Sequence, residues 1–309
     1  MTVLVNLIVM LGMFAVVPMG LALIDGPRPG PLRRVRRIWP LAAVAGSTAL
    51  WLPRGPLAAT LAGAYAAATL LLALHAPYRL IRTRSLAPRE IAVLTALVTP
   101  AVAGTALVAE RAGHRLCGFD LRILSLTVPH FHFAGFAAAL TAGLVCHATG
   151  RRSGRLAALS VPAGTLLVLL GYFVDDWAEL AGALVLTAGM WLVGLLTWRD
   201  VRGTVPDRTT RALLGVSAAV LVATMLLALS WALGEATGLP HPTLGWMAAT
   251  HGLGNALGFA LCALLAWGRI QHSAGRPSAG PDHTPPTAPA PGSATAPTPG
   301  SAPKGRTAA

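Results

Sequence analysis

Residues 3–24 read VLVNLIVMLGMFAVVPMGLALI, an unbroken run without a charged side chain. A run of about 18 or more apolar residues is long enough to cross the hydrocarbon core of a bilayer as a helix. Inside that core every backbone amide must be paired, which favours helices over open strands. No basic residue precedes the run, so it lacks the positive start of a signal peptide. We interpret it as a first membrane-spanning helix.

Similar runs recur along the whole chain and predict an all-α polytopic transmembrane bundle. The sequence is 54% hydrophobic and only 11% charged, whereas a soluble domain carries about 25% charged residues. The run 39–52 is shorter than a full crossing, but counting it gives about nine spans. The predicted spans are residues 3–24, 39–52, 57–74, 91–109, 123–148, 156–173, 178–198, 212–233 and 246–268. Together they make a transmembrane domain over residues 1–272.

Basic residues predict how this bundle is oriented. With the N-terminus outside, the inner loops and the C-terminal segment hold 20 of the 24 lysines and arginines. The outer loops then hold Arg54, Arg111, Arg115 and Arg122. This asymmetry matches the positive-inside rule, so we expect the N-terminus outside and the C-terminus in the cytoplasm. The net charge of +13 is thereby explained without nucleic acid as a partner.

The last part of the chain, residues 273–309, has a different composition. It consists mostly of Pro, Ala, Ser, Thr and Gly, with almost no large apolar side chain. Such a segment buries too little apolar surface to offset its loss of conformational entropy. We therefore expect a disordered cytoplasmic tail.

Two groups of polar side chains interrupt the apolar runs. His130 and His132 directly follow Pro129 in the fifth predicted span, and His251 and Asn255 lie four residues apart in the ninth. Both groups should lie in the outer half of the bilayer, about 7–14 Å deep at 1.5 Å per residue. Positions 130 and 132 face opposite ways on a regular helix, so only a break at Pro129 would turn both toward one site.

Packing alone is the alternative explanation, because polar side chains also join membrane helices by hydrogen bonds. Three histidines and an asparagine at one depth favour a functional polar site, since ionisable groups in a membrane usually line a cavity or pathway. Glu110 and Glu179 are candidate supporting carboxylates at the same level. His130, His132 and His251 could also ligate a metal, with zinc, copper or haem iron the candidates.

Three stretches resemble the YndJ-like family of bacterial membrane proteins. Residues 118–127 and 130–136 resemble its GF…LT..HFH(Y/F)AGF signature, and residues 251–259 resemble its HG..NALGF segment. Pro129 departs from the small apolar residue expected at that position and suggests a kink particular to this chain. The resemblance implies a multi-pass protein of the bacterial plasma membrane, sometimes labelled a transporter, without an established reaction.

A transporter or proton-linked permease is the leading functional hypothesis. This hypothesis is favoured by the many spans and by the lack of a soluble catalytic motif. It is also favoured by the histidines, which change protonation near neutral pH. The alternative is an intramembrane metal- or haem-dependent enzyme that acts on a lipid or quinone-like substrate. A structural or signalling membrane protein is the third possibility. The expected partners are the lipid bilayer and a small molecule, lipid or ion.

Overall fold

A computed structural model describes residues 2–26 and 30–274 of the chain, so the predicted tail lies almost wholly outside the described residues. In the described part all regular structure is helical, apart from an isolated bridge between Leu116 and Phe119. The α-helices are α1 (Thr2–Leu11), α2 (Val17–Asp25), α3 (Arg33–Trp51), α4 (Pro56–Ala73), α5 (His75–Thr83), α6 (Pro88–Ala112), α7 (Leu121–His130), α8 (Ala138–Thr149), α9 (Arg152–Gly171), α10 (Asp176–Leu196), α11 (Arg208–Thr237), α12 (Leu244–Met247) and α13 (Cys262–Ala274). Short π-helical segments continue several of these, namely η1 (Gly12–Val16), η2 (Phe131–Ala137), η3 (Thr197–Val201), η5 (Ala248–Gly252) and η6 (Gly254–Leu261), and η4 (Arg202–Thr204) is a 3₁₀ turn.

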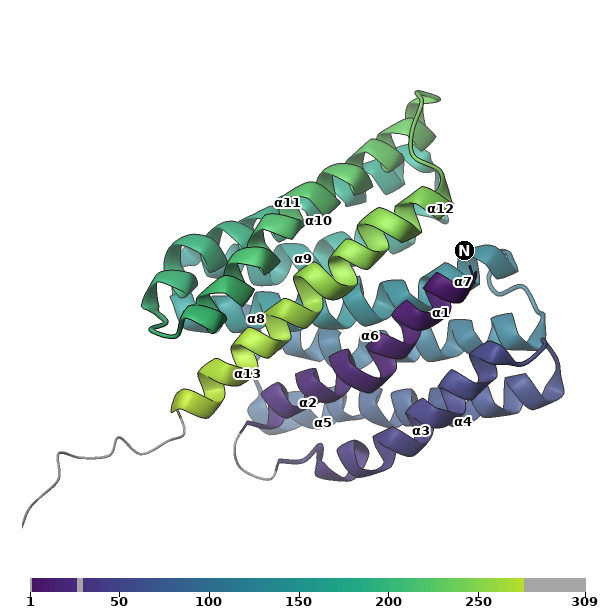
Figure 1. Cartoon of the computed structure of the whole chain (residues 1–309), viewed down its shortest axis with the longest axis horizontal. Coiled ribbons are helices and arrows are strands. Elements are labelled where there is room, and N and C mark those ends of the chain that lie inside the picture. Colours follow the sequence, from purple (N-terminus) through teal and green to yellow (C-terminus); the bar gives the residue numbers. More distant parts are fainter. Residues whose placement is uncertain (1, 27–29, 275–309) are drawn as a thin grey trace, which may run out of the picture. The chain divides into compact units, whose positions relative to one another are not determined.

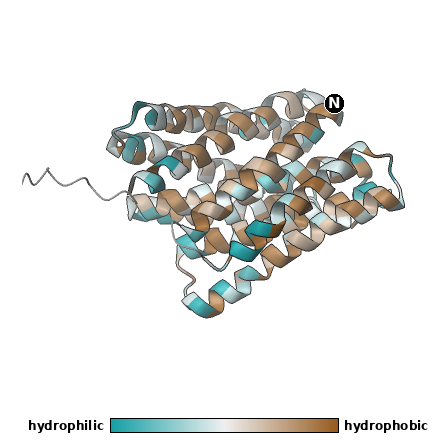
Figure 2. Ribbon diagram, turned by 60° about the horizontal axis from the view of Figure 1, so that its bottom comes forward, coloured by the Kyte–Doolittle hydropathy of each residue, from teal (hydrophilic) through white to brown (hydrophobic). Residues whose placement is uncertain are grey.

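Eight continuous helical stretches within the described residues are long and apolar enough to cross a membrane. They run side by side in Figure 1, and Figure 2 shows apolar residues along most of their length, with hydrophilic residues gathered near loops and helix ends. The sequence predicted nine spans, which is one more than the number of these candidates. The difference is α3, which begins at Arg33 and not at residue 39. Its first turns carry four arginines, which make it too polar to qualify by composition.

Helix α3 nevertheless runs along the first span from end to end. Near its start, Arg36 forms an ion pair with Asp25 at the end of α2. Near its finish, the Leu50 carbonyl accepts a hydrogen bond of 3.1 Å from the Asn6 amide in α1. Helix α3 is therefore antiparallel to α1–α2, and its 19 residues run along most of the 24-residue first span.

Polar contacts join the loops into two groups at opposite ends of the bundle. At one end, which we call the basic end, Arg269 of α13 pairs with Asp207 ahead of α11. Hydrogen bonds to Asp207 from Thr210 and from Arg269 hold the pKa of this carboxyl below its usual range. The Gln271 amide donates to the Leu23 carbonyl at the same end, so α13 is fastened to both α2 and α11.

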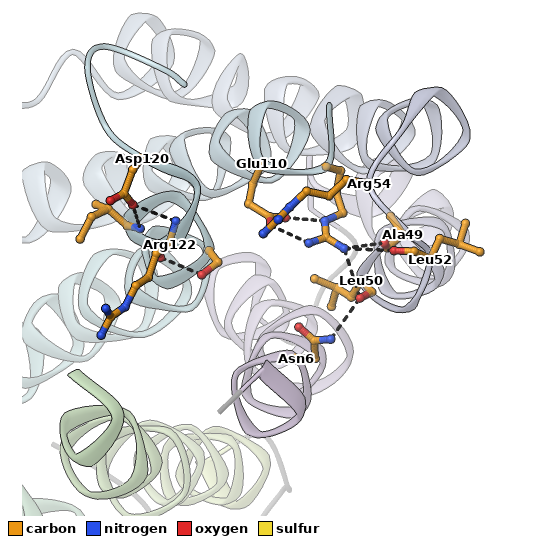
Figure 3. A network of polar contacts seen from close by, with 11 residues as sticks. Asn6, Ala49, Leu50, Leu52, Arg54, Glu110, Asp120 and Arg122 are labelled. Carbon is orange, nitrogen blue, oxygen red and sulfur yellow. Dashed lines mark hydrogen bonds and ion pairs between the residues drawn. The ribbon is translucent and has the colours of Figure 1, made fainter. Parts of the chain in front are cut away.

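The other end, which we call the Glu110 end, is organised by one buried carboxylate (Figure 3). Glu110 is only 2% exposed and accepts hydrogen bonds from Arg54 at 2.8 and 3.0 Å and from Arg111 at 2.6 Å. Arg111 also donates to the carbonyls of Leu50 and Leu52 at the end of α3. This cluster joins α6 to the α3–α4 connection and satisfies carbonyls that a helix end leaves unpaired.

Replacing the central carboxylate, Glu110→Gln, should lower the free energy of unfolding by about 3 kcal/mol. The substitution leaves two guanidinium groups without their negative partner, and breaking a buried pair on one side costs about 3–5 kcal/mol. Unfolding by a denaturing detergent, followed by circular dichroism, measures the effect.

Glu90→Gln is the matched control, because Glu90 pairs with Arg79 in a more exposed setting at the other end. Its expected loss is below about 1 kcal/mol. Equal losses for the two variants would contradict a special role for Glu110.

Candidate functional site

The polar residues noted in the sequence lie where the helices depart from α geometry. A π-helical segment, Phe131–Ala137, starts two residues after Pro129, and two more contain His251 and Asn255. The segment Gly12–Val16 in the first span packs against both regions. Proline lacks the amide hydrogen that continues an α-helix, and π-helical turns are frequent at functional sites. The break expected at Pro129 is thus present.

His132 lies in the packed interior with both ring nitrogens in use. Its Nδ1 donates to the Val128 carbonyl at 2.6 Å, which leaves Nε2 as the acceptor for the Tyr65 hydroxyl at 2.5 Å. The ring is fully buried, and it fits because a Cβ at Gly12 would come within 2.9 Å of it. His132 therefore joins three of the eight candidate spans, Thr2–Asp25, Pro56–Thr83 and its own Leu121–Thr149, and has no free nitrogen for a ligand.

His130 faces a different environment, a partly open cavity of about 630 Å³ that we call the main cavity. Two positions on a helix are roughly 200° apart, so His130 and His132 point to opposite sides in spite of the π-helical turn. The His130 side chain is exposed in the described structure and stacks edge-to-face on Phe131. It makes no side-chain hydrogen bond to any described residue, so both ring nitrogens are available.

His251 and Asn255 line the same cavity and form a hydrogen-bonded unit with Thr224 of α11. His251 Nδ1 donates to the Thr224 carbonyl at 2.7 Å, so its Nε2 accepts from the Asn255 amide at 3.1 Å. The Thr224 hydroxyl donates to the Asn255 carbonyl oxygen at 2.8 Å. Gly254 allows this approach, since a Cβ there would come within 2.8 Å of Thr224. This pattern of bonds is the one that a neutral imidazole with Nδ1 protonated makes.

The lining of the main cavity also includes Glu179 and Tyr172. Glu179 lies in the first turns of α10 and is 7% exposed. Gly171 places it there, because a Cβ at Gly171 would come within 2.5 Å of the Glu179 backbone. Apolar surroundings, and then the charge of Glu179, raise the pKa of the Tyr172 hydroxyl above its usual range, so it remains a hydrogen-bond donor at neutral pH.

The structure thus divides the predicted site. His130, His251, Asn255 and Glu179 line the main cavity, whereas His132 is enclosed by protein. Glu110 lines a separate cavity of about 350 Å³ with Arg54 and Arg111. Within residues 2–26 and 30–274, no three His, Cys, Asp or Glu side chains are grouped closely enough to hold a metal ion. The three histidines considered as metal ligands do not converge.

Sequence reasoning missed the partners of these side chains. Tyr65 and Thr224 each lie inside a long apolar run, and a polar side chain in such a run is the signal that could have identified them. Nothing in the local sequence pairs Tyr65 with His132, because 67 positions separate the two residues.

Removing the hydroxyl that holds His132, Tyr65→Phe, should lower the free energy of unfolding by about 1–2 kcal/mol. An average hydrogen bond between membrane helices contributes about 0.6 kcal/mol, but here His132 Nε2 would be left buried without a donor. Thermal unfolding of the purified protein in detergent measures the change. Tyr78→Phe is the control, since Tyr78 is 52% exposed, and a Tyr65→Phe protein as stable as this control would contradict the prediction.

Comparison with known proteins places this architecture in a family. The family model described as YndJ-like protein matches residues 7–259. The uncharacterized membrane protein YndJ of Bacillus subtilis (strain 168) is 26% identical over 201 residues, which cover 64% of this chain and 36% of that protein. The chain therefore spans just over a third of the length of this relative. No solved structure matches the chain.

The helical structure and the relative agree on where the protein resides. Eight candidate spans and a membrane-protein relative identify a multi-pass protein of the cell membrane. The family match extends from the first span into the π-helical segment that holds Asn255. It covers most of the chain, which thus belongs to the YndJ-like family.

Proposed function

We propose that the protein is a transporter that holds an amphipathic small molecule in the main cavity. The observation that carries this proposal is the cavity itself, whose volume is about 630 Å³. Ligand cavities typically measure about 300–1,000 Å³ and combine an apolar lining with a few well-placed polar groups. The main cavity has this composition, so the hydrocarbon part of a ligand would contact most of its wall.

Polar groups in the lining would orient such a ligand. Thr224 holds His251 and Asn255 in place, and the close approach of α9 and α10 positions Glu179. His130 lines the cavity, and neither of its ring nitrogens forms a hydrogen bond to a described residue. Such a histidine is suited to exchanging protons. A proton-linked mechanism would use His130 first, because His251 already has both nitrogens engaged.

We further propose that α3 crosses the membrane as a ninth span, with the N-terminus outside. The contacts of α3 at both ends of the first span support this. The loops of the basic end would then face the cytoplasm, in line with the distribution of arginine. The main cavity includes Cys117 and Phe119 from a loop at the Glu110 end, so it would lie in the outer half of the bilayer.

The alternative of an intramembrane metal enzyme has less support. Tyr65 and Asn255 occupy the Nε2 atoms of His132 and His251, and a metal would have to displace both. No observation in the described residues favours the enzyme over a carrier, so we do not propose it.

The orientation predicts which cysteine a membrane-impermeant maleimide reaches in intact cells. Cys117 is exposed in a loop at the Glu110 end, so it should react from outside after Cys146 and Cys262 are changed to alanine. Ser85→Cys, in a chain lacking the native cysteines, should react only after permeabilisation, because Ser85 follows α5 at the basic end. The reverse pattern would invert the proposed topology.

Filling the main cavity should prevent ligand binding. Ala183→Trp places a large side chain in the cavity wall, whereas Ala67→Trp places one on an exposed face of α4. A neutral alkyl diazirine alcohol should photolabel the peptides around Met225 and Met247 in the parent protein and in the Ala67→Trp control. Mass spectrometry should find this labelling abolished by Ala183→Trp. Equal labelling of the two variants would show that the cavity does not hold the probe.

A further inference from the structure

Glu179 differs from the other buried carboxylates of the described chain. Asp25 is paired with Arg36, and Glu110 is paired with Arg54 and its sequence neighbour. Glu179 is just as enclosed, but no arginine, lysine or histidine within residues 2–26 and 30–274 lies within ion-pair distance of it. Its neighbouring hydrogen-bond donor is the Tyr172 hydroxyl, which carries no positive charge.

The cavity lining supplies no compensating charge either. The chain has a net charge of +13, yet none of the described residues that line the main cavity is an arginine or a lysine. The hydrogen-bond pattern of His251 matches a neutral ring. A carboxylate in such surroundings is costly unless a positive charge or a proton accompanies it.

Aromatic rings line the cavity beside Tyr172, the neighbour of Glu179. Phe119 packs edge-to-face on Tyr172 and Phe173, with ring centroids 5.8 and 5.2 Å apart. All three rings line the cavity, as does Trp231 of α11. The face of an aromatic ring attracts a cation within about 6 Å, and tryptophan does so best. Aromatic rings beside a single buried carboxylate are suited to an organic cation.

We propose that the main cavity recognises a lipophilic monovalent cation, an amine or onium group on a hydrocarbon body, with its charge at Glu179 and the adjacent aromatic rings. This inference rests on the proposed function, because it assumes that the cavity holds a ligand. The apolar remainder of the lining would take up the hydrocarbon body. The ligand would supply the positive charge that the protein supplies to its other buried carboxylates.

Tetraphenylphosphonium and tetraphenylborate provide the test, since they share a shape and differ in the sign of their charge. Equilibrium binding to the purified full-length protein in lipid nanodiscs should favour the phosphonium ion. Glu179→Gln should weaken phosphonium binding by about 30-fold or more, as expected when one member of a buried charge pair is lost. Glu179→Asp should restore part of the affinity, and Asp200→Asn should change nothing, because Asp200 pairs with Arg151 at the far end of the same helical stretch and does not line the cavity.

The neutral diazirine alcohol separates the two proposals in the same preparation. If it labels the cavity in the Glu179→Gln protein while that protein loses phosphonium binding, both proposals are supported and the variant is folded. If it labels the cavity but both ions bind equally and independently of Glu179, the cation inference is wrong and the binding function stands. If neither ion binds and the alcohol labels nothing, both proposals are wrong.

Discussion

A polar group inside the hydrocarbon region is costly unless it finds a partner within the protein, and most of the structure follows from this constraint. Backbone amides meet it by forming helices. Side chains meet it through specific contacts, such as the bond between Tyr65 and His132 and the unit of His251, Asn255 and Thr224. These contacts join helices that are distant in the sequence. Because an unsatisfied group costs more in lipid than in water, they fix which helices are neighbours.

The stretch from Val128 to His132 shows how a short segment can serve three regions. The Val128 side chain lines the smaller cavity, His130 lines the main cavity and His132 is locked against Tyr65. The bond from His132 to the Val128 carbonyl holds the segment where Pro129 weakens the helix. The hydrogen-bonded residues Val128 and His132 thus flank His130, although the His130 side chain itself forms no hydrogen bond to any residue that the structure describes.

Glu110 and Glu179 show that burial alone does not define the role of a carboxylate. Both are enclosed in the described structure, at 2% and 7% exposure. Glu110 is surrounded by two guanidinium groups and fastens one end of the bundle. Glu179 faces an apolar cavity beside aromatic rings and lacks such partners. The first arrangement stabilises the fold, whereas the second leaves a carboxyl group at the cavity without a charged partner in the described part of the chain.

The sequence by itself determined the helical membrane architecture, because long apolar runs can satisfy their amides only as helices. It also identified Pro129 as a break and His251 with Asn255 as a pair, since both depend on local spacing. It could not set the true start of α3, whose arginines extend a helix that hydropathy alone would shorten. Only the tertiary structure showed that His130 and His132 lie in different surroundings, and that Glu179 and Glu110 do as well. The physical reason is that the partners, Tyr65, Thr224 and Arg54, lie 31–67 positions away and are brought close by helix packing.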